Sequence, residues 1–244
     1  MRRRCMAVAA VSAALGALLW IGDRGVGAFA LGISDGDRLT RWRGDFIVLK
    51  IDPSVEAIAP VDDVVSVFWY ALSDWIDSAD LPLSPVVEAG SCGGHSYTAN
   101  GTNVNCVFAT AGAPDGQDQD VGGTAHQSYL EDTGEIVDVD ISLSTSVGSW
   151  SLAAAEGSLS LRAVALHEIG HLLGLEHSAI EGAAMYAMTT IDGAQTDDLA
   201  DDDIRGARAL YAEGKEEDYG CAAAPVGGRT GRAHASPLVL LLAY

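Results

Sequence analysis

The sequence predicts an α+β domain with an α/β-like alternation of strands and helices, and three observations support this prediction. Residues 45–51 are a run of β-forming side chains that ends at Asp52-Pro53. Residues 61–77 instead repeat apolar side chains at every third or fourth position, which is the spacing of one helix face. Residues 158–173 have the same helical spacing and also carry two histidines. A chain of 244 residues, 48% of them hydrophobic, suits one globular domain with terminal extensions.

The first 30 residues have the pattern of a secretory signal peptide. Arg2, Arg3 and Arg4 precede an apolar run at 6–21, and Ala28-Phe29-Ala30 then supplies a small-x-small cleavage pattern. We therefore expect cleavage after Ala30 and an exported protein, either secreted or at the cell surface. The alternative is an uncleaved membrane anchor, but the apolar run is shorter than the roughly 20 residues that span a bilayer. No stable membrane span is expected in the mature domain.

The mature domain is expected to open with a loose polar stretch, residues 31–43. The helix predicted at 61–77 has Pro60 before its first turn and Asp62 and Asp63 within that turn, where proline and acidic side chains are favourable. Its apolar positions predict a buried face rather than a cofactor site, and they are Val61, Val64, Val65, Phe68, Leu72, Trp75 and Ile76.

Two further strands are predicted at 86–89 and 103–110, on either side of a loop rich in Gly, Ser and Asn. Cys92 and Cys106 also flank this loop. Because an exported chain meets an oxidising compartment, the two cysteines are expected to form a disulfide. Closing a loop of this length stabilises a folded protein by roughly 3 kcal/mol in the chain-entropy model.

A pair of strands is expected at 123–130 and 135–144, joined by the turn Asp132-Thr133-Gly134. Alternation along the second strand places Asp138 and Asp140 on one face and its apolar side chains on the other. Two acids so placed are a candidate Ca²⁺ site, with loop carbonyls completing the coordination. The alternative is a polar face turned to solvent.

The histidine-bearing helix follows residues 148–157, which read as a linker, and Ser158 is a candidate N-cap. His167 and His171 are four residues apart, so their imidazoles lie one turn apart on the same face. The apolar stripe lies on another side and consists of Leu161, Val164, Ala165, Ile169, Leu172 and Leu173. One side of the helix can therefore pack while another presents a metal to a cleft.

The residues around the two histidines predict a zinc site. Two imidazole nitrogens at this spacing can bind one Zn²⁺, and Glu168 is close enough to reach a metal-bound water without being a ligand. Gly174 lets the helix stop, so that His177 can return as a third ligand. Three protein ligands leave a fourth position for water, which is typical of catalytic zinc. The alternative is a buried helix with incidental histidines. Five positions fit the zinc-site pattern and weigh against this alternative, namely His167, Glu168, His171, Gly174 and His177.

The charge of the chain bears on its partners. Its 34 acidic and 14 basic side chains give a formal charge of −20, which excludes nucleic acid as an expected partner. The acidity is consistent with keeping a secreted protein soluble.

A family resemblance emerges beyond the third histidine. The pattern His-Glu-x-x-His-x-x-Gly-x-x-His, followed by a methionine turn, resembles the metzincin zinc peptidases. Ser178 after the third histidine, and Met185 followed directly by Tyr186, resemble the matrixin branch, which contains the matrix metalloproteinases and their bacterial relatives. The astacin and serralysin branches usually have a tyrosine two positions after the methionine, where this chain has Ala187.

The end of the domain adds to the resemblance. Asp202-Asp203-Ile204-x-Gly206-x-x-x-Leu210-Tyr211, in a predicted final helix, is similar to the close of a matrixin catalytic domain. The specific motifs cover residues 155–211. The order of strands and helices before them is compatible with the family.

The resemblance implies a metzincin (zincin) fold. Such a fold has a twisted mixed sheet, mostly parallel with one antiparallel edge strand, together with a long active-site helix, a Met-turn and a C-terminal helix. Residues 122–129 would be the edge strand, and a peptide substrate would lie beside it as an added strand. Met185 would form the apolar floor beneath the zinc, and residues 189–191 would help to wall the specificity pocket.

Three departures from the matrixin pattern are visible. Ala187 stands where proline usually follows the Met-Tyr pair. His126 falls where a structural-zinc histidine often sits, but Asp138 stands where another such histidine is expected, so a second zinc is not predicted. No cysteine-switch motif lies between Ala30 and the first strand, so the usual inhibitory propeptide is not expected and the resemblance gives no account of latency.

Together these observations predict an exported zinc endopeptidase whose catalytic domain is residues 31–213. One Zn²⁺ would be held by the three histidines, and Glu168 would act as general base toward the bound water. The expected partner is a polypeptide substrate, and the protein is expected to be a monomer. The alternatives are a catalytically silent binding protein on the same fold, or a zinc hydrolase of non-peptide substrates.

The tail, residues 214–244, has a different composition from the domain. It is rich in Ala, Gly and Pro, contains Cys221, and ends in an apolar run at 237–243 that is too short to span a membrane. It resembles the Cys-containing sorting tails of some exported proteins of Gram-negative bacteria. The alternative is a disordered low-complexity tail with an odd cysteine.

Overall fold

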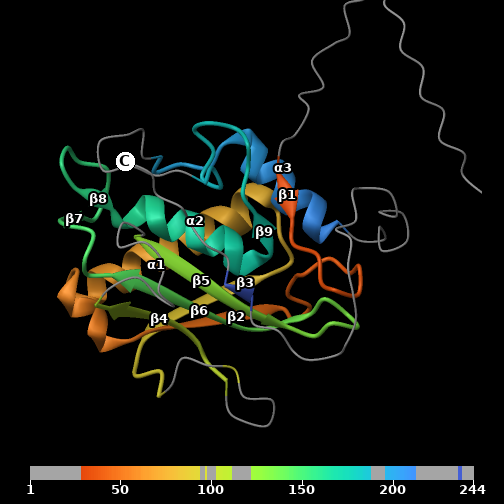
Figure 1. The fold of residues 1–244 in the computed structure, drawn as a ribbon, viewed down its shortest axis with the longest axis horizontal. Helices are drawn as coiled ribbons and strands as arrows, with labels where there is room; N and C mark the ends of the chain where they lie inside the picture. The colour runs from red at the N-terminus through yellow and green to blue at the C-terminus, as the bar shows by residue number, and fades with distance from the viewer. Residues whose placement is uncertain are drawn as a thin grey trace, which may run out of the picture.

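A six-stranded mixed sheet is the main structural element of the protein (Figure 1). The structure is a computed structural model, and it describes residues 29–93, 97, 103–111, 122–187, 196–212 and 236–237. The strands lie side by side in the order β10 (Ser236–Pro237), β5 (Gly123–Tyr129), β6 (Ile136–Ser144), β4 (Asn105–Thr110), β2 (Phe46–Ile51) and β3 (Ser84–Ala89).

Most neighbouring strands in this sheet are parallel. β2 pairs in parallel with both β3 and β4, and β4 pairs in parallel with β6. β5 is antiparallel to β6, and β10 is antiparallel to β5. The predicted mixed sheet with an antiparallel strand on one side is therefore confirmed, with the added finding that the outer edge of β5 is itself paired.

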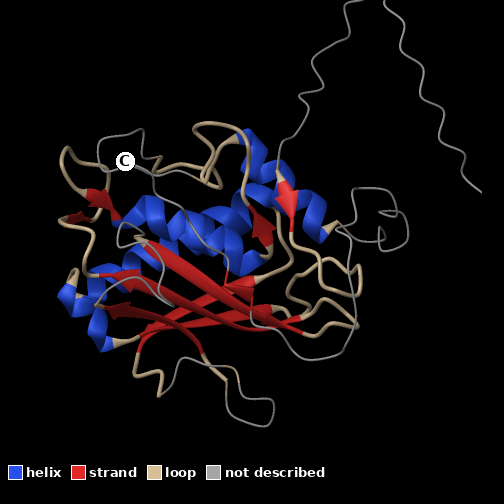
Figure 2. Cartoon of the chain, viewed as in Figure 1, coloured by secondary structure: helices blue, strands red, loops and turns tan. Residues whose placement is uncertain are grey.

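The two long helices, α1 (Val61–Ala79) and α2 (Leu161–Leu173), pack together over the sheet (Figure 2). The indole Nε1 of Trp75 on α1 donates a hydrogen bond to the carbonyl of Leu166 on α2, at 2.9 Å. A shorter helix, α3 (Asp201–Tyr211), contacts both α1 and α2. A 3₁₀ helix, η1 (Pro53–Ala57), follows β2 and has Asp52 as its side-chain cap. Among the described residues, no helix is long and apolar enough to cross a bilayer.

Two small sheets correct the sequence analysis. β1 (Ala30–Leu31) pairs with β9 (Leu175–Glu176), and Gly32 N donates to the carbonyl of Gly174 at 2.9 Å. Residues 31–43 are therefore packed against the end of α2, and the expected loose stretch is wrong. β7 (Trp150–Ser151) pairs with β8 (Leu159–Ser160), so residues 148–157 are more than a linker.

The predicted disulfide between Cys92 and Cys106 is present, and it joins the segment after β3 to β4. Cys106 is fully buried. Several other predictions lie outside the described residues, namely the signal peptide up to residue 28, the pocket wall at 189–191, and Cys221 with most of the tail.

Candidate active site

Helix α2 begins and ends through its own sequence. The hydroxyl of Ser160 accepts a hydrogen bond from Ala163 N at 3.1 Å, so Ser160 is the N-cap and the predicted cap at Ser158 is wrong. Gly174 ends the helix with a φ of 105°, a left-handed conformation that glycine adopts without strain. Of its thirteen residues only Arg162 is not buried, so α2 packs on all sides rather than on one stripe.

The structure brings His167, His171 and His177 together. One ring nitrogen from each lies within 4.8 Å of the others. His167 and His171 project from α2 with their Nε2 atoms 3.0 Å apart, and His177 follows β9. His177 Nε2 is buried without a hydrogen-bond partner among the described residues.

Backbone carbonyls orient the two helix histidines. His167 Nδ1 lies 2.6 Å from the carbonyl oxygen of Ala184, and His171 Nδ1 lies 2.8 Å from that of Leu175. Because a carbonyl only accepts, each Nδ1 carries the proton and each Nε2 keeps a lone pair. Both lone pairs point into the space that the three rings share.

Burial keeps these imidazoles neutral. It lowers the pKa of His167 to about 4, with a further lowering from His177 that the Ala184 carbonyl partly offsets. Burial also lowers the pKa of His171 and that of His177. Three neutral imidazoles with converging nitrogens match the donor set of a catalytic Zn²⁺. Zinc bonds of 2.0–2.1 Å imply tetrahedral nitrogens about 3.3 Å apart, so the residues fit the ion.

Glu168 lies beside the histidines with 1% of its surface exposed. Burial raises the pKa of its carboxyl to about 8, and the backbone of Ala125 in β5 only partly offsets this. A Cβ on Gly123, also in β5, would come within 2.8 Å of Glu168 Oε1. Glu168 therefore packs against β5 at a position where that strand has a glycine in place of a side chain.

Met185 lies under the histidine-bearing helix with 1% of its surface exposed. A Cβ on Gly170 would meet its sulfur at 2.1 Å, so the glycine is needed for this close approach. Ser178, which follows the third histidine, donates from its backbone N–H to the carbonyl of Met185 at 2.7 Å. The Met-turn is thus bonded to the segment that carries His177.

One residue holds the Met-turn in place, and the sequence analysis did not assign it that role. Asp203 on α3 accepts hydrogen bonds from Ala184 N at 2.8 Å and from Met185 N at 3.0 Å. Asp203 also accepts a hydrogen bond from Ala200 N at 2.8 Å, and only 1% of its surface is exposed. The carbonyl of the same Ala184 orients His167. The sequence analysis named Asp203 only as part of the motif that closes a matrixin catalytic domain, and the acidic first turn of α3 reads equally well as an ordinary helix start.

The pair Asp138 and Asp140 faces away from the apolar side of β6 and lies outside the histidine site. Each residue is 4% exposed, so the alternative that these two side chains face solvent is wrong. Each also has an Oδ1 with no hydrogen-bond partner among the described residues. Burial raises the pKa of Asp138 to about 6, and burial together with the Asp138 charge raises that of Asp140 to about 7.

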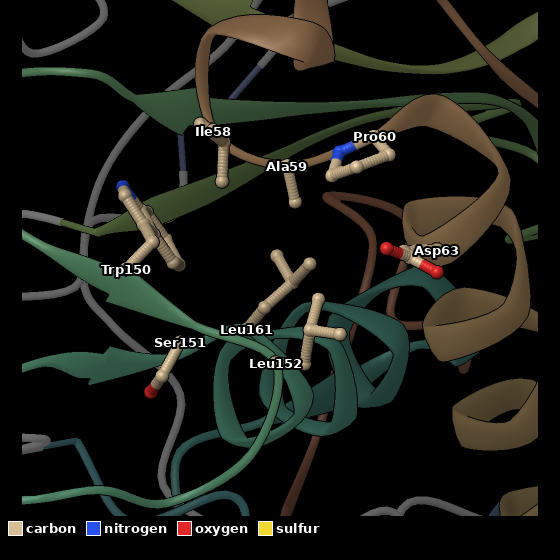
Figure 3. A pocket seen from close by; sticks show the side chains of 8 residues that line it. All are labelled: Ile58, Ala59, Pro60, Asp63, Trp150, Ser151, Leu152 and Leu161. Atoms are coloured by element: carbon tan, nitrogen blue, oxygen red, sulfur yellow. The ribbon is translucent and has the colours of Figure 1, made fainter.

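A separate pocket of about 240 Å³ lies at the start of α2 (Figure 3). Its lining consists of Ile58, Ala59, Pro60, Asp63, Trp150, Ser151, Leu152 and Leu161. Neither Glu168 nor any of the three histidines lines it. We therefore assign it no part in the site.

The fold and the site define a class of protein. A mixed sheet, a helix with two zinc-type histidines and a glutamate, a third histidine beyond the helix end, and a methionine turn beneath them are the parts of a metzincin metallopeptidase. Residues 41–212 match the model of one family, Matrixin. Since the match spans more than half of the chain, the protein belongs to the matrixin family of zinc metalloendopeptidases.

Three relatives agree with this membership. The chain is 32% identical to Metalloendoproteinase 2-MMP of Arabidopsis thaliana over 152 residues, which are 62% of this chain and 37% of the relative. It is 30% identical to Metalloendoproteinase 1-MMP of the same plant over 173 residues, 70% of this chain and 44% of the relative. It is 42% identical to Matrix metalloproteinase-9 of Canis lupus familiaris over 62 residues, 25% of this chain and 8% of the relative. The chain therefore spans less than half the length of these relatives.

We predict that Asp203→Ala weakens metal retention as well as stability. The change leaves three N–H groups at the Met-turn and the start of α3 without their acceptor, which costs about 1–3 kcal/mol for each buried group. Urea unfolding should show a large loss, and dialysis against graded chelator should remove zinc at lower chelator concentration. Asp201→Ala is the matched control, because Asp201 lies in the same helical turn and is exposed. Equal zinc retention in the two variants would contradict this role for Asp203.

Proposed function

We propose that this chain is an exported zinc endopeptidase with its catalytic domain at residues 31–213. The observation that carries the proposal is the placement of a buried Glu168 between three converging neutral imidazoles and the edge of β5. A Zn²⁺ ion held by His167, His171 and His177 would supply an activated water and polarise the scissile carbonyl.

Glu168 is the group that we propose to move the proton. Its carboxyl group lies one residue from the zinc ligand His167, where it would take a proton from the activated water and return it to the leaving amine. Burial keeps the carboxyl away from bulk water, and the absence of a side chain at Gly123 leaves it room at the edge of β5. The carboxylate is therefore available on the side where an extended peptide would lie.

The edge of β5 is the proposed binding surface for the substrate. Gln127 donates from its side chain to the carbonyl of His171, which fixes the strand alongside the histidine helix. The backbone of β5 can pair with any extended chain, because such pairing uses main-chain groups alone. This supports a polypeptide substrate over a small ester or another non-peptide compound.

We expect Glu168→Ala to bind zinc as the parent does and to lose at least 10²-fold in casein cleavage, since general-base catalysis contributes about 10²–10⁴-fold. Glu181→Ala is the control, because Glu181 is exposed in the turn after His177. Metal content and rate should be measured on the same samples, with and without chelator. A variant that cleaves at the parental rate would disprove the mechanism, and a parent that holds zinc but cleaves neither peptides nor esters would favour the binding-protein alternative.

Calcium is the cation that we propose for Asp138 and Asp140. Two buried carboxylates with unpartnered oxygens suit a hard cation, which prefers oxygen ligands. Without a cation, the folded protein holds protons on these groups up to about pH 6–7, whereas the unfolded chain releases them near pH 4. The folded state then binds more protons in this range, so the free energy of unfolding falls as the pH rises from about 4 to about 8 and is flat above it.

Thermal unfolding across pH, with and without calcium, tests this proposal. The parent should lose on the order of 5 kcal/mol between pH 4 and 8 without calcium and regain part of it at pH 7.5 when calcium is added. Asp140→Asn should flatten the pH dependence and abolish the response to calcium, whereas the exposed Asp132→Asn should change neither. A parent whose melting temperature ignores calcium at pH 7.5 would rule out the cation.

Export is supported by the signal-peptide pattern of the first 30 residues. Cleavage after Ala30 would leave Leu31, the second residue of β1, as the new N-terminus. When the full chain is expressed in a bacterial host that secretes proteins, the exported product should begin at Leu31 by intact mass. Ala30→Asp should block processing, because the position before the cut needs a small side chain. A parent chain that keeps residues 1–30 outside the cell would contradict the assignment.

A further inference from the structure

A segment of the tail occupies the edge of β5. Ser236 lies opposite Gln127 and Pro237 lies opposite His126, in an antiparallel two-residue strand, β10. It is drawn in dark blue against β5 in Figure 1. Residue 236 follows the end of α3 by 25 positions, so this pairing joins parts of the chain far apart in sequence.

The hydrogen-bond pattern of β5 shows which of its residues can bind a neighbour. Ser144 N donates to the Gly122 carbonyl at 2.9 Å, so this pair exchanges bonds between β5 and β6. Bonded and non-bonded pairs alternate in an antiparallel ladder, and Thr124 and His126 therefore also bond toward β6. The backbone groups of Gly123, Ala125 and Gln127 point the other way, to the outer edge.

The tail matches this pattern. Ser236 lies opposite Gln127, whose N–H and carbonyl point outward, and it has its own N–H to donate. Pro237 has no N–H, but it lies opposite His126, whose backbone bonds toward β6. The absence of an N–H on Pro237 therefore leaves no backbone carbonyl of β5 without a donor at this register. If β10 shifted by one residue, Pro237 would lie opposite a residue whose carbonyl points outward, and that carbonyl would lack its donor.

The occupied part of the edge adjoins the proposed catalytic centre. Gln127 bonds through its side chain to the carbonyl of His171, and the next outward residues along β5 are Ala125 and Gly123. Both of these lie against Glu168. An added strand at Gln127 thus uses the same surface on which a peptide substrate would have to lie.

We infer that Ser236–Pro237 is an internal ligand of the peptide-binding edge and competes with substrate for it. The contact itself is independent of catalysis, whereas its inhibitory consequence rests on the proposed peptidase function. The edge of β5 is then a surface whose resident partner is this chain's own tail.

Tethering makes such a contact effective. A short extended peptide binds weakly when free, because the entropy that it loses on binding is offset by only a few hydrogen bonds. Joined to the domain, it is present at an effective concentration on the order of millimolar. The residues between Ala212 and Ser236 can span at most about 80 Å when extended, against a domain diameter of about 40 Å, so the tail can reach the edge from the end of α3.

Two variants of the full-length chain test the inference. Ser236→Pro removes the N–H that faces Gln127, and Ser236→Ala removes only the hydroxyl. We expect Ser236→Pro to lower the apparent KM for a peptide substrate at least fivefold with kcat unchanged, and Ser236→Ala to match the parent. Intact mass before and after each assay verifies that the tail is still attached.

Hydrogen exchange of the segment 123–129 gives a second readout that needs no activity. It is measured in the Glu168→Ala background, which prevents self-cleavage. Exchange should quicken in Ser236→Pro and not in Ser236→Ala. If parent and Ser236→Pro are both active with equal KM and equal exchange, the inference is overturned. If no chain cleaves any substrate, the proposed function fails, and the exchange result alone then decides whether the tail docks.

Discussion

The hydrogen bonds from the two helix histidines to the carbonyls of Ala184 and Leu175 are the constraint on which the site depends. They fix which nitrogen of each ring carries a proton and so which one faces the shared space. Neither carbonyl belongs to the histidine-bearing helix. One lies in the Met-turn, held by Asp203 from α3, and the other lies in β9, paired with β1. The metal geometry is therefore assembled from five segments, namely α2, the Met-turn, α3, β9 and β1, and α2 alone would not specify it.

Close packing around α2 is the second requirement. Met185 and Trp75 both lie against Gly170, and Glu168 lies against Gly123. Because neither glycine has a side chain, Met185 can approach α2 closely from below, and β5 can approach Glu168 closely. The same packing excludes water from the imidazoles and keeps them neutral. Stability and metal-binding capacity share these contacts, so a core change near Gly170 affects both.

The local parts of the structure could be predicted from the sequence, whereas the long-range parts could not. The spacing of His167, Glu168 and His171 fixes their relation because a helix fixes it, and the apolar repeat of 61–77 predicted α1 within two residues. The burial of Asp138 and Asp140 was missed, since alternation assigns a face to each side chain but does not say what covers that face. The bond from Asp203 to the Met-turn links segments 18 and 19 residues apart, and no local pattern encodes it. The strands β10 and β5 lie still farther apart in the sequence, and only two residues of β10 form the pairing, so no local pattern predicts it.

The pairing of β1 with β9 has a practical consequence for anyone who produces this protein. Ala30 lies opposite Glu176 and Leu31 opposite Leu175, and the next residue after β9 is His177. An affinity tag or fusion partner joined directly before Leu31 would therefore emerge beside the strand that delivers the third histidine. The start of the mature domain is therefore not a neutral attachment point, whereas a tag inserted into the exposed turn at Asp132-Thr133 would leave the pairing of β1 with β9 intact.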